Sequence, residues 1–552
     1  MLLFEDYWKR IFDSIKSTFP EAGERDLAVD LSGHGDLAFR AFQIMKSRKL
    51  KPDEILEKLR LSLGSEEYIQ KIEQVGGYIN FTLKPSRLIE AIWKEIDGTG
   101  RFPDIFQDPE RVSVEHTSTN PTGPIHIGRI RNSIIGDSLA KLVDRYGYRV
   151  TTQYFVNDSG KQVASLYAGY TKFVEKEEPS VYDLLEGYKK ANEEMEAGKE
   201  INRDVDEIIR SYERGDPETI AGIRKICTII LGGITKSLQD IGISIDDYTW
   251  ESDLIRTGDV ERVLEELDGN IHDENGAKYV LSNDRKMFLT RGDGTSLYFS
   301  RDLAYHEYKF QNFDWLIDIL GENHKEHAAH VEYVLKKLMG QENRLDFVFY
   351  SYVSLETGKM STRKGHIVTL DELVQRAIGE SLKVVKEKRS DLPEEKLNEI
   401  ARSVAISAIR FHILKLNSNK PMVFRWSEAL NLEGDSAPFI MYSYARAASI
   451  LRKLSDQSWE ISDSYDQHEA ALIRQIYLYP YTLTDSLKGL KPENIANYLL
   501  ELTRKFNDFY TNCPVISAPE EERKRRVLII RAYKTVIRDA AEIVGLRILE
   551  EM

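Results

Sequence analysis

Cysteine is scarce in this sequence of 552 residues, which contains only Cys227 and Cys513. The two lie far apart and show no paired spacing, so they predict neither a disulfide framework nor a thiolate metal site. We therefore expect no structural zinc and a reducing, cytoplasmic compartment. No apolar run is long enough for a signal peptide or a membrane span, and membrane association is not expected.

An excess of basic charge is also missing, since 76 Lys and Arg residues face 90 Asp and Glu residues, with a formal net charge of -14. This balance argues against a protein that coats nucleic acid unselectively, although a local basic face can still bind phosphate. There is no internal repeat and no low-complexity tract. An apolar content of 41% can build more than one core in a chain of this length, so we expect a globular protein of roughly three or four domains.

Four regions follow one another along the chain. Residues 1–105 mix helical patterns with the strand signal "YINFTL" and predict a small α+β module. Residues 106–365 repeat a strand, loop, helix rhythm that predicts a Rossmann-type parallel sheet, with a charged helical insertion at about 165–235. A helical connector is expected at 366–430 and an all-α domain at 431–552.

Beyond the insertion, strand patterns resume in "KYVLS", "MFLTRGDGTSLYFSRD" and "WLIDILG". We expect these stretches to continue the same sheet. If "YFSRDLAYHEY" opens a helix instead, Tyr298 and Asp302 stand four residues apart on one of its faces.

The stretch "NPTGPIHIGRIRNSIIGD", residues 120–137, joins a Pro/Gly loop to a helix. Such a loop lets the backbone approach a ligand, and the helix start adds unpaired N–H groups that favour phosphate. His126 stands at this junction, with Arg129 and Arg131 behind it, and we predict that it donates hydrogen bonds to a triphosphate. The alternative is that His126 only caps the helix.

A second loop, "GKMSTRKG" at residues 358–365, brings Lys359, Arg363 and Lys364 together between glycines. It can bend over an anionic ligand and move when the ligand leaves. The alternative is an ordinary basic surface loop. Neither loop matches G-x-x-x-x-G-K-[ST] or G-x-G-x-x-G, so a P-loop ATPase and a dinucleotide enzyme are unsupported.

Together the two loops resemble the paired signatures of class I aminoacyl-tRNA synthetases, HIGH and KMSKS in one-letter code. Other stretches resemble arginyl-tRNA synthetases in particular, and the similarity runs over most of the chain. These stretches are "VEHTSTNPTGPIHIGRIRNSIIGD", "FVNDSGKQ", "IDDYTWES", "TRGDGTSLYFSRDLAY", "KMSTRKG" and "GDSAPFIMYSYARAASILRK".

The resemblance implies a ligase of protein biosynthesis that uses ATP with Mg²⁺, L-arginine and tRNA(Arg). Arginine would be activated to arginyl-adenylate and then transferred to the terminal adenosine of the tRNA, first at its 2′-hydroxyl, with AMP and pyrophosphate released. The family further implies that tRNA must be present before activation. We expect a monomer with no metal ligands from the protein and no editing site, since a pocket that requires hydrogen bonds from its ligand discriminates well unaided.

By the same resemblance, the two loops supply the residues that contact the ATP phosphates. They are His126, Gly128, Arg129, Lys359, Ser361, Arg363 and Lys364. The chain departs from the signatures at Arg129, which replaces a histidine, and at Thr362, which replaces a lysine. We predict that Arg129, Arg363 and Lys364 supply the missing cationic donors.

A site for free arginine needs carboxylates and an acceptor in the plane of the guanidinium, and such a site rejects lysine and citrulline. The residues that match or resemble the family's positions are Glu115, Asn120, Glu251, Tyr298 and Asp302, with His324 as a weaker candidate near a strand end. Asn157 and Gln162 are weaker candidates. The alternative for each acidic residue is a surface charge or a helix cap.

Contacts to tRNA are predicted on two helical stripes and on one strand. The residues are Asn80, Phe81, Tyr442, Arg446, Lys453, Arg531 and Lys534. In "PFIMYSYARAASILRK" the polar stripe faces away from an apolar stripe, and beside an anticodon it offers phosphate contacts and aromatic stacking. The alternatives are a solvated helix face and, for Asn80 and Phe81, a buried strand with a capped turn.

Two other functions stay open. One is an adenylate-forming ligase of the same superfamily that does not use tRNA, against which the long helical carboxyl-terminal region argues. The other is a non-catalytic paralogue that binds tRNA or a partner. Arg129 favours this reading, whereas Lys359, Glu251 and Asp302 argue against it.

Overall fold

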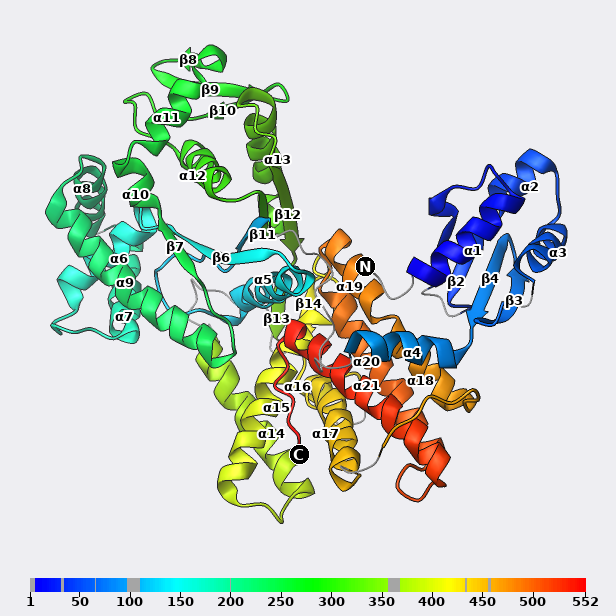
Figure 1. Ribbon diagram of the computed structural model, residues 1–552. Helices are drawn as coiled ribbons and strands as arrows, with labels where there is room; N and C mark the ends of the chain where they lie inside the picture. Colours follow the sequence, from blue (N-terminus) through cyan, green and yellow to red (C-terminus); the bar gives the residue numbers. More distant parts are fainter. Residues whose placement is uncertain are drawn as a thin grey trace. The chain divides into compact units, whose positions relative to one another are not determined.

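The protein, seen in a computed structural model, folds as two compact units (Figure 1). One unit combines residues 1–105 with 430–552, and the other holds residues 106–429. The structure describes residues 5–30, 34–64, 66–96, 110–198, 200–355, 368–431, 434–454 and 458–552. The finer division into four regions stays a prediction. Among the described helices, none is both long enough and apolar enough to cross a membrane.

A parallel sheet forms the centre of the larger unit (Figure 1). Its described strands are β5 (Arg111–Glu115), β6 (Arg149–Val156), β7 (Asp247–Trp250), β11 (Trp315–Gly321) and β12 (Arg344–Tyr350). They lie in the order β12-β11-β5-β6-β7, and every neighbouring pair is parallel. This doubly wound order confirms the predicted Rossmann-type core. The order reverses between β5 and β11, and such sheets bind ligands at the carboxyl ends of the strands beside that switch point.

Helix α5 (Ile127–Tyr146) follows β5 and packs against both the sheet and helix α15 (Glu394–Leu414). Because neighbours cover it on several sides, most of its residues are buried, including Asp137. Asp137 forms an ion pair with the fully buried Arg410 of α15. Asp137 also pairs with Lys141 at 2.7 Å, so both buried charges have partners inside the unit.

The predicted helical insertion is present between β6 and β7. It consists of α6 (Gly160–Phe173), α7 (Val181–Glu196), α8 (Ile201–Glu213) and α9 (Pro217–Asp240). The helices begin earlier and end later than the predicted stretch at about 165–235. A small apolar cluster, centred on Ala191, Ile201 and Val205, holds α6, α7 and α8 together.

One prediction about the sheet is wrong. The stretches "KYVLS" and "MFLTRGDGTSLYFSRD" do not join the parallel sheet, because β8 (His272–Glu274), β9 (Ala277–Ser282) and β10 (Arg285–Phe288) form a separate antiparallel sheet. Two-residue turns connect these strands, and their four residues have left-handed backbones. This is the geometry of type I′ hairpins, which the Asn275–Gly276 pair favours. From Tyr298 the chain forms helix α12 (Tyr298–Asn312).

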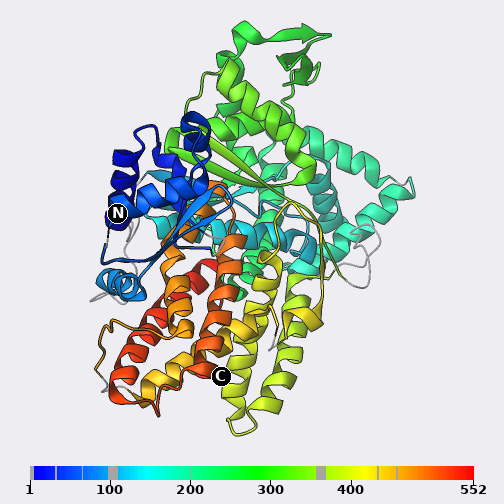
Figure 2. The ribbon, with the colours of Figure 1, turned by 90° about the vertical axis from the view of Figure 1, so that its right-hand side faces the viewer.

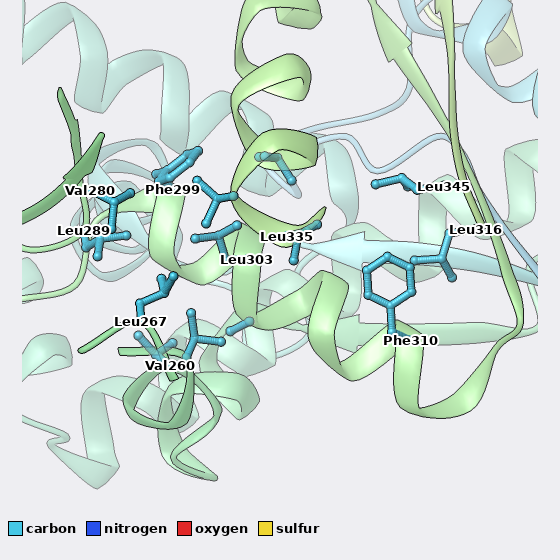
Figure 3. Close-up of a cluster of buried hydrophobic side chains, with 14 residues drawn as sticks. Val260, Leu267, Val280, Leu289, Phe299, Leu303, Phe310, Leu316, Leu335 and Leu345 are labelled. Atoms are coloured by element: carbon cyan, nitrogen blue, oxygen red, sulfur yellow. The ribbon is translucent and has the colours of Figure 1, made fainter. Parts of the chain in front are cut away.

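Helix α12 is held by an apolar cluster beside the parallel sheet (Figure 3). The residues labelled there are Val260, Leu267, Val280, Leu289, Phe299, Leu303, Phe310, Leu316, Leu335 and Leu345. Because α12 turns Phe299 and Leu303 toward this cluster, a different side of the helix carries Tyr298 and Asp302. The packing thus sets the direction in which those two polar groups point.

The larger unit ends in a pair of long helices. Helix α14 (Leu370–Lys388) and helix α15 run side by side and are joined by a short connection (Figure 2). The short strands β13 (Val353–Leu355) and β14 (Met422–Phe424) pair in parallel and tie the chain that precedes α14 to the chain that follows α15. The predicted helical stretch after residue 366 is therefore interrupted by a strand.

The smaller unit combines an antiparallel sheet with a helical bundle. Its strands are β1 (Leu27–Val29), β2 (Leu37–Arg40), β3 (Ile69–Val75) and β4 (Tyr78–Leu83), in the order β1-β2-β4-β3. Its helices are α1 (Glu5–Thr18), α2 (Phe42–Arg48), α3 (Pro52–Leu63), α4 (Pro85–Ile96), α17 (Ala437–Lys453), α18 (Gln467–Tyr477), α19 (Tyr479–Gly489), α20 (Glu493–Asn512) and α21 (Glu520–Val544).

An ion pair links the two parts of this unit, where α4 packs on α18 and α21. Arg474 of α18 lies 3.4 Å from the buried carboxylate of Asp36 and also donates a hydrogen bond to the Leu83 carbonyl at 3.2 Å. Burial raises the pKa of Asp36, and Arg474 opposes that shift.

The predicted fold class, a Rossmann-type core with an α+β amino-terminal module and an all-α carboxyl-terminal region, is confirmed.

Candidate active site

The loop that follows β5 is anchored to its neighbours at a strained position. Thr117 and Ser118 have positive φ angles of 73° and 22°, which β-branched Thr rarely adopts. The Asn132 side chain of α5 accepts a hydrogen bond from the Thr117 N–H and donates one to the Ile319 carbonyl of β11 at 2.7 Å. These hydrogen bonds therefore hold the loop after β5 in place beside the switch point.

His126 caps the amino terminus of α5, as the alternative reading of the sequence expected. The Gly128 N–H donates to His126 Nδ1 at 3.2 Å, so the neutral ring carries its proton on Nε2. Burial, followed by the nearby Arg129 cation, lowers the pKa of His126 to about 4. A neutral donor at a helix amino terminus suits a phosphate oxygen, and the phosphate role of His126, Gly128 and Arg129 stays a prediction.

The second loop lies outside the described residues, and with it Lys359, Ser361, Arg363 and Lys364. Its described flanks nevertheless reach the first loop. The Ile127 N–H donates to the Val368 carbonyl at 3.2 Å, and the Leu370 N–H donates to the Ile125 carbonyl at 2.9 Å. The chain leaving the second signature is therefore hydrogen-bonded to the first.

Arg131 anchors the chain before the second loop and does not face a phosphate site. Its fully buried guanidinium donates to the carbonyls of Ser351 at 2.8 Å, Asn417 at 2.9 Å and Lys420 at 2.6 Å. The expectation that Arg131 assists His126 at a triphosphate is not supported, since the side chain is used to join three segments of this unit.

Asp302 lies on the second turn of α12, and two histidines contact its carboxylate. His327 Nε2 is 2.6 Å from Oδ2, and His306 Nδ1 is 3.2 Å from Oδ1. Burial alone would raise the pKa of Asp302, but the two imidazoles hold it well below its ordinary value. Tyr298 stands one turn earlier with 46% of its surface exposed, and its ring contacts that of His327. The predicted pair thus forms an anionic, partly open site.

Glu251 begins helix α10 (Glu251–Arg256) at the end of β7 and is only 1% exposed. Both of its carboxylate oxygens have partners within the protein. Arg301 Nη1 lies 3.2 Å from Oε1, and the Ser159 hydroxyl donates to Oε2 at 2.6 Å. In the amide orientation that satisfies its neighbours, Asn157 also donates to Oε2 at 3.0 Å. The guanidinium that pairs with Glu251 therefore belongs to Arg301 of the same chain.

Glu115 ends β5 and is nearly buried. Its Oε2 accepts a hydrogen bond from Lys309 Nζ at 2.8 Å, and its Oε1 accepts one from the Ser118 hydroxyl at 2.9 Å. Asn120, on the exposed part of the loop, donates to Gln162 Oε1 at 2.8 Å. Glu115 pairs in register with Asp318 of β11, and both carboxylates contact residues of α12, the helix that carries Asp302.

His324 follows β11 in a short 3-10 turn and is partly buried. Burial lowers its pKa, and the neighbouring His327 and Arg129 lower it further. Arg129 of the first signature is thus near enough to His324 to influence its charge. Among the described residues, no group of three His, Cys, Asp or Glu side chains is arranged to hold a metal ion.

Sequence reasoning missed the residues that support these carboxylates. They are Arg301, His306, Lys309, Asp318 and His327. One signal was present, since Tyr298, Asp302, His306 and Lys309 follow a helical spacing of three to four residues. This stripe of polar residues at helical spacing could have been interpreted as a buried ionic face.

The predicted tRNA stripe on α17 points outward, and its apolar counterpart is buried, as expected. Arg446 lies over two exposed rings, 4.8 Å from the centroid of Tyr442 and 4.3 Å from that of Tyr510. It also donates to Asn507 Oδ1 at 3.1 Å, and Lys453 is exposed at the end of the helix. Tyr510 of α20 completes this aromatic platform and was not predicted.

The side chains of the other predicted tRNA contacts are less exposed to solvent. Lys534 of α21 lies 2.8 Å from Glu550 Oε1, and Arg531 is partly buried. Asn80 and Phe81 are buried in β4, with exposures of 3% and 0%, which agrees with the alternative of a buried strand. Their role in binding tRNA stays a prediction.

Comparison with known families decides the assignment. Residues 102–426 match the family model described as tRNA synthetases class I (R), catalytic domain. The chain belongs to the class I arginyl-tRNA synthetases. Residues 6–83 match the arginyl tRNA synthetase N terminal domain, and residues 440–552 match the DALR anticodon binding domain of this family.

Individual members of the family resemble the chain from end to end. The arginine–tRNA ligase of Thermoplasma acidophilum is 46% identical over 100% of both chains. That of Archaeoglobus fulgidus is 36% identical over 98% of this chain and 100% of its own. The solved arginyl-tRNA synthetase of Thermus thermophilus superposes with a TM-score of 0.85, at 24% identity, over 99% of this chain and 100% of its own, and so shares the fold.

Proposed function

We propose that the protein is an ATP-dependent arginine–tRNA ligase that forms arginyl-adenylate and transfers arginine to tRNA(Arg). One observation carries the proposal: the ionised Asp302 carboxylate and Tyr298 share one partly open face of α12 at the sheet edge where His126 caps α5. An anion beside a helix amino terminus is suited to a ligand with a cationic end and a phosphorylated end.

The guanidinium of arginine binds at Asp302, with Tyr298 as the neighbouring polar group. Asp302 suits this role because its two histidine partners keep it ionised while its side chain remains 16% exposed. Glu251 contributes to the pocket wall, where it orients Arg301 and Ser159. A pocket of this kind rejects citrulline, which has no positive charge to offer the buried carboxylate.

The α-amino and carboxylate end of arginine lies toward Glu115, Asn120 and His324. Glu115 and Asp318 supply negative charge at the carboxyl edge of the sheet, and Asn120 is exposed on the loop. This orientation directs the substrate carboxylate toward the first signature, because His324 and Arg129 interact electrostatically.

The ATP phosphates bind between the two signatures. His126 Nε2 and Arg129 donate to them from the first loop, Gly128 allows close approach, and Lys359, Ser361, Arg363 and Lys364 contribute from the second. The hydrogen bonds of Ile125 and Ile127 to the chain after the second loop support this arrangement. Mg²⁺ would enter as part of the ATP complex and would neutralise charge on the phosphates.

The reaction has two steps, and neither needs a nucleophile from the protein. An oxygen of the arginine carboxylate attacks the α-phosphorus, and the bond to the pyrophosphate oxygen breaks. The 2′-hydroxyl of the terminal adenosine then attacks the adenylate carbonyl, and AMP leaves. The protein contributes orientation and stabilises the charge that develops on phosphate.

The tRNA is held by the smaller unit. Tyr442, Arg446 and Tyr510 offer a stacking platform to anticodon bases, while Lys453, Arg531 and Lys534 contact the backbone. Asn80 and Phe81 support the surface of the amino-terminal module beneath the tRNA elbow. We place the protein in the cytoplasm, consistent with a sequence that holds only two cysteines, and we propose that it acts as a monomer.

An exchange assay tests this function. Arginine should drive ATP–pyrophosphate exchange, and the rate should depend on added tRNA. Lysine and citrulline should support no exchange and compete weakly with arginine. Exchange driven equally well by another amino acid, or activation without any transfer to tRNA, would contradict the proposal.

A further inference from the structure

His306 connects the proposed arginine site to a buried ionic cluster behind it. One turn after Asp302 on α12, its Nδ1 faces the Asp302 backbone carbonyl at 2.8 Å and the Asp302 carboxylate at 3.2 Å. Its Nε2 faces Asp318 Oδ2 at 2.9 Å. The ring is 4% exposed, so water cannot replace either partner.

The contacts of His306 fix its protonation. A carbonyl and a carboxylate only accept hydrogen bonds, so a ring that faces acceptors through both nitrogens must carry a proton on each. The resulting imidazolium is a cation between two aspartates. In agreement, these carboxylates raise the pKa of His306 to about 9, although burial and the Lys309 ammonium act in the opposite direction.

Lys309 extends the cluster. Its fully buried ammonium lies 2.8 Å from Glu115 Oε2 and 2.8 Å from each oxygen of Asp318. The cluster therefore holds three carboxylates, Glu115, Asp302 and Asp318, against two cations, His306 and Lys309. Asp302 also contacts His327 and has the most exposed side chain of the three carboxylates, so it is the one that the cation of a bound substrate can reach.

We propose that His306 is a positioning residue for arginine, which links Asp302 to Asp318 and Lys309 and so fixes the carboxylate edge that receives the guanidinium. This inference rests on the proposed function. Without the second proton, the ring can donate to only one of its two aspartate partners, so the orientation of the Asp302 carboxylate is no longer fixed. His306 thus acts through Asp302 and contacts no reacting atom.

The groups around His306 lie on four elements of this unit. Asp302, Tyr305 and Lys309 lie on α12, Asp318 on β11 and Phe347 on β12, while Glu115 of β5 acts through Lys309. Lys309 keeps its proton across the accessible range, since its carboxylate partners raise its pKa to about 12 despite burial. The group of this cluster that changes charge near pH 9 is therefore His306.

The test uses a probe with constant charge. Butylguanidinium has no α-amino group and stays protonated, so its competitive inhibition constant against arginine reports the Asp302 site alone. In the full-length protein this constant should rise several-fold between about pH 7.5 and pH 9.5, as His306 loses its proton. The KM for ATP, measured in parallel, should not follow that change.

A substitution of His306 provides the second part of the test. His306→Gln should raise the KM for arginine and the butylguanidinium constant by about 10- to 100-fold near neutral pH, with no further rise toward pH 9.5. His330→Gln is the matched control, because His330 is also a buried histidine of this unit but bonds Ser282 at 2.9 Å, away from Asp302. It should keep the wild-type constant and its pH dependence.

The outcomes separate the two proposals. A wild-type protein that does not charge tRNA with arginine would overturn the proposed function. A protein that charges arginine but binds butylguanidinium equally well at both pH values would overturn the role of His306. The role also fails if His306→Gln leaves the arginine KM unchanged, or raises the KM values of arginine and ATP together.

Discussion

Glu115 and Asp318 lie side by side on neighbouring parallel strands and share one ammonium, with Lys309 Nζ 2.8 Å from each carboxylate. All three groups are buried. Two carboxylates at this spacing would repel each other strongly without the cation between them. The carboxyl edge of the sheet is therefore stable only while Lys309 is in place.

Lys309→Met tests this dependence. Removing the shared cation leaves the buried Glu115 without its ion-pair partner and Asp318 with His306 alone, so we expect a loss of about 3–5 kcal/mol in the free energy of unfolding, measured by urea denaturation. Lys383→Met removes the exposed partner of Glu380 and should cost less than about 1 kcal/mol. Similar effects of the two substitutions would contradict the importance of the buried cluster.

The two acidic residues of the proposed pocket should differ in their effects. Asp302→Asn removes the charge that faces the guanidinium, and we expect kcat/KM for arginine to fall by at least about 100-fold. Glu251→Gln acts through Arg301 and should cost less, about 10-fold, because the substrate does not lose its direct partner. Aminoacylation kinetics at saturating ATP and tRNA would compare them, and the reverse order would rule out this division of roles.

His126 can be tested separately as a helix cap and as a phosphate donor. Asn is a good cap, so His126→Asn should leave thermal stability nearly unchanged while slowing adenylate formation by about 10- to 100-fold. His126→Ala should lose the same rate and also about 1 kcal/mol of stability. If His126→Asn keeps the full rate, the residue is only a cap.

Stability should depend on alkaline pH through His306. Its pKa in the folded protein, about 9, lies above the value near 6.5 of an unfolded histidine. The extra stability is complete below pH 6.5 and is lost as pH rises through about 9, by at most about 3 kcal/mol. Thermal unfolding midpoints should fall over this range and fall less in His306→Gln, whereas parallel curves would exclude His306 as the source.

The aromatic platform should affect tRNA and not arginine. Arg446→Lys keeps the charge but loses the planar group between Tyr442 and Tyr510, so we expect the KM for tRNA to rise by about 10-fold. The arginine KM should not change. Lys505→Met, on the same helix as Tyr510 but paired with Glu501, provides a control that should leave both values unchanged.

Local patterns predicted much of this fold. The helix from Ile127 and the strand at Trp315–Gly321 follow from periodicity and turn residues, and the buried stripe of α17 follows from helical spacing. The hairpins of β8–β10 were misassigned to the main sheet, although the Asn–Gly pair at 275–276 favours a tight reversal. Alternation alone does not say which sheet a strand joins.

The candidate site was predicted residue by residue, but its internal partners were not. The contact between Lys309 and Glu115 joins positions 194 residues apart, and no local pattern encodes such a distance. The same holds for Arg301, whose guanidinium approaches Glu251 only because α12 and α10 meet at the sheet edge. Periodicity identifies the face of a helix, and tertiary packing decides which charge it meets.

The contacts of Arg131 affect how the protein folds during its synthesis on the ribosome. Its buried guanidinium takes its carbonyl acceptors from Ser351, Asn417 and Lys420, so most of these partners are synthesised nearly three hundred residues after it, as the separations of 286 and 289 positions show. Until the last of these acceptors leaves the exit tunnel, the Arg131 guanidinium of the emerging α5 cannot be buried with its hydrogen bonds satisfied. The nascent larger unit therefore completes its folding only when translation has passed Lys420.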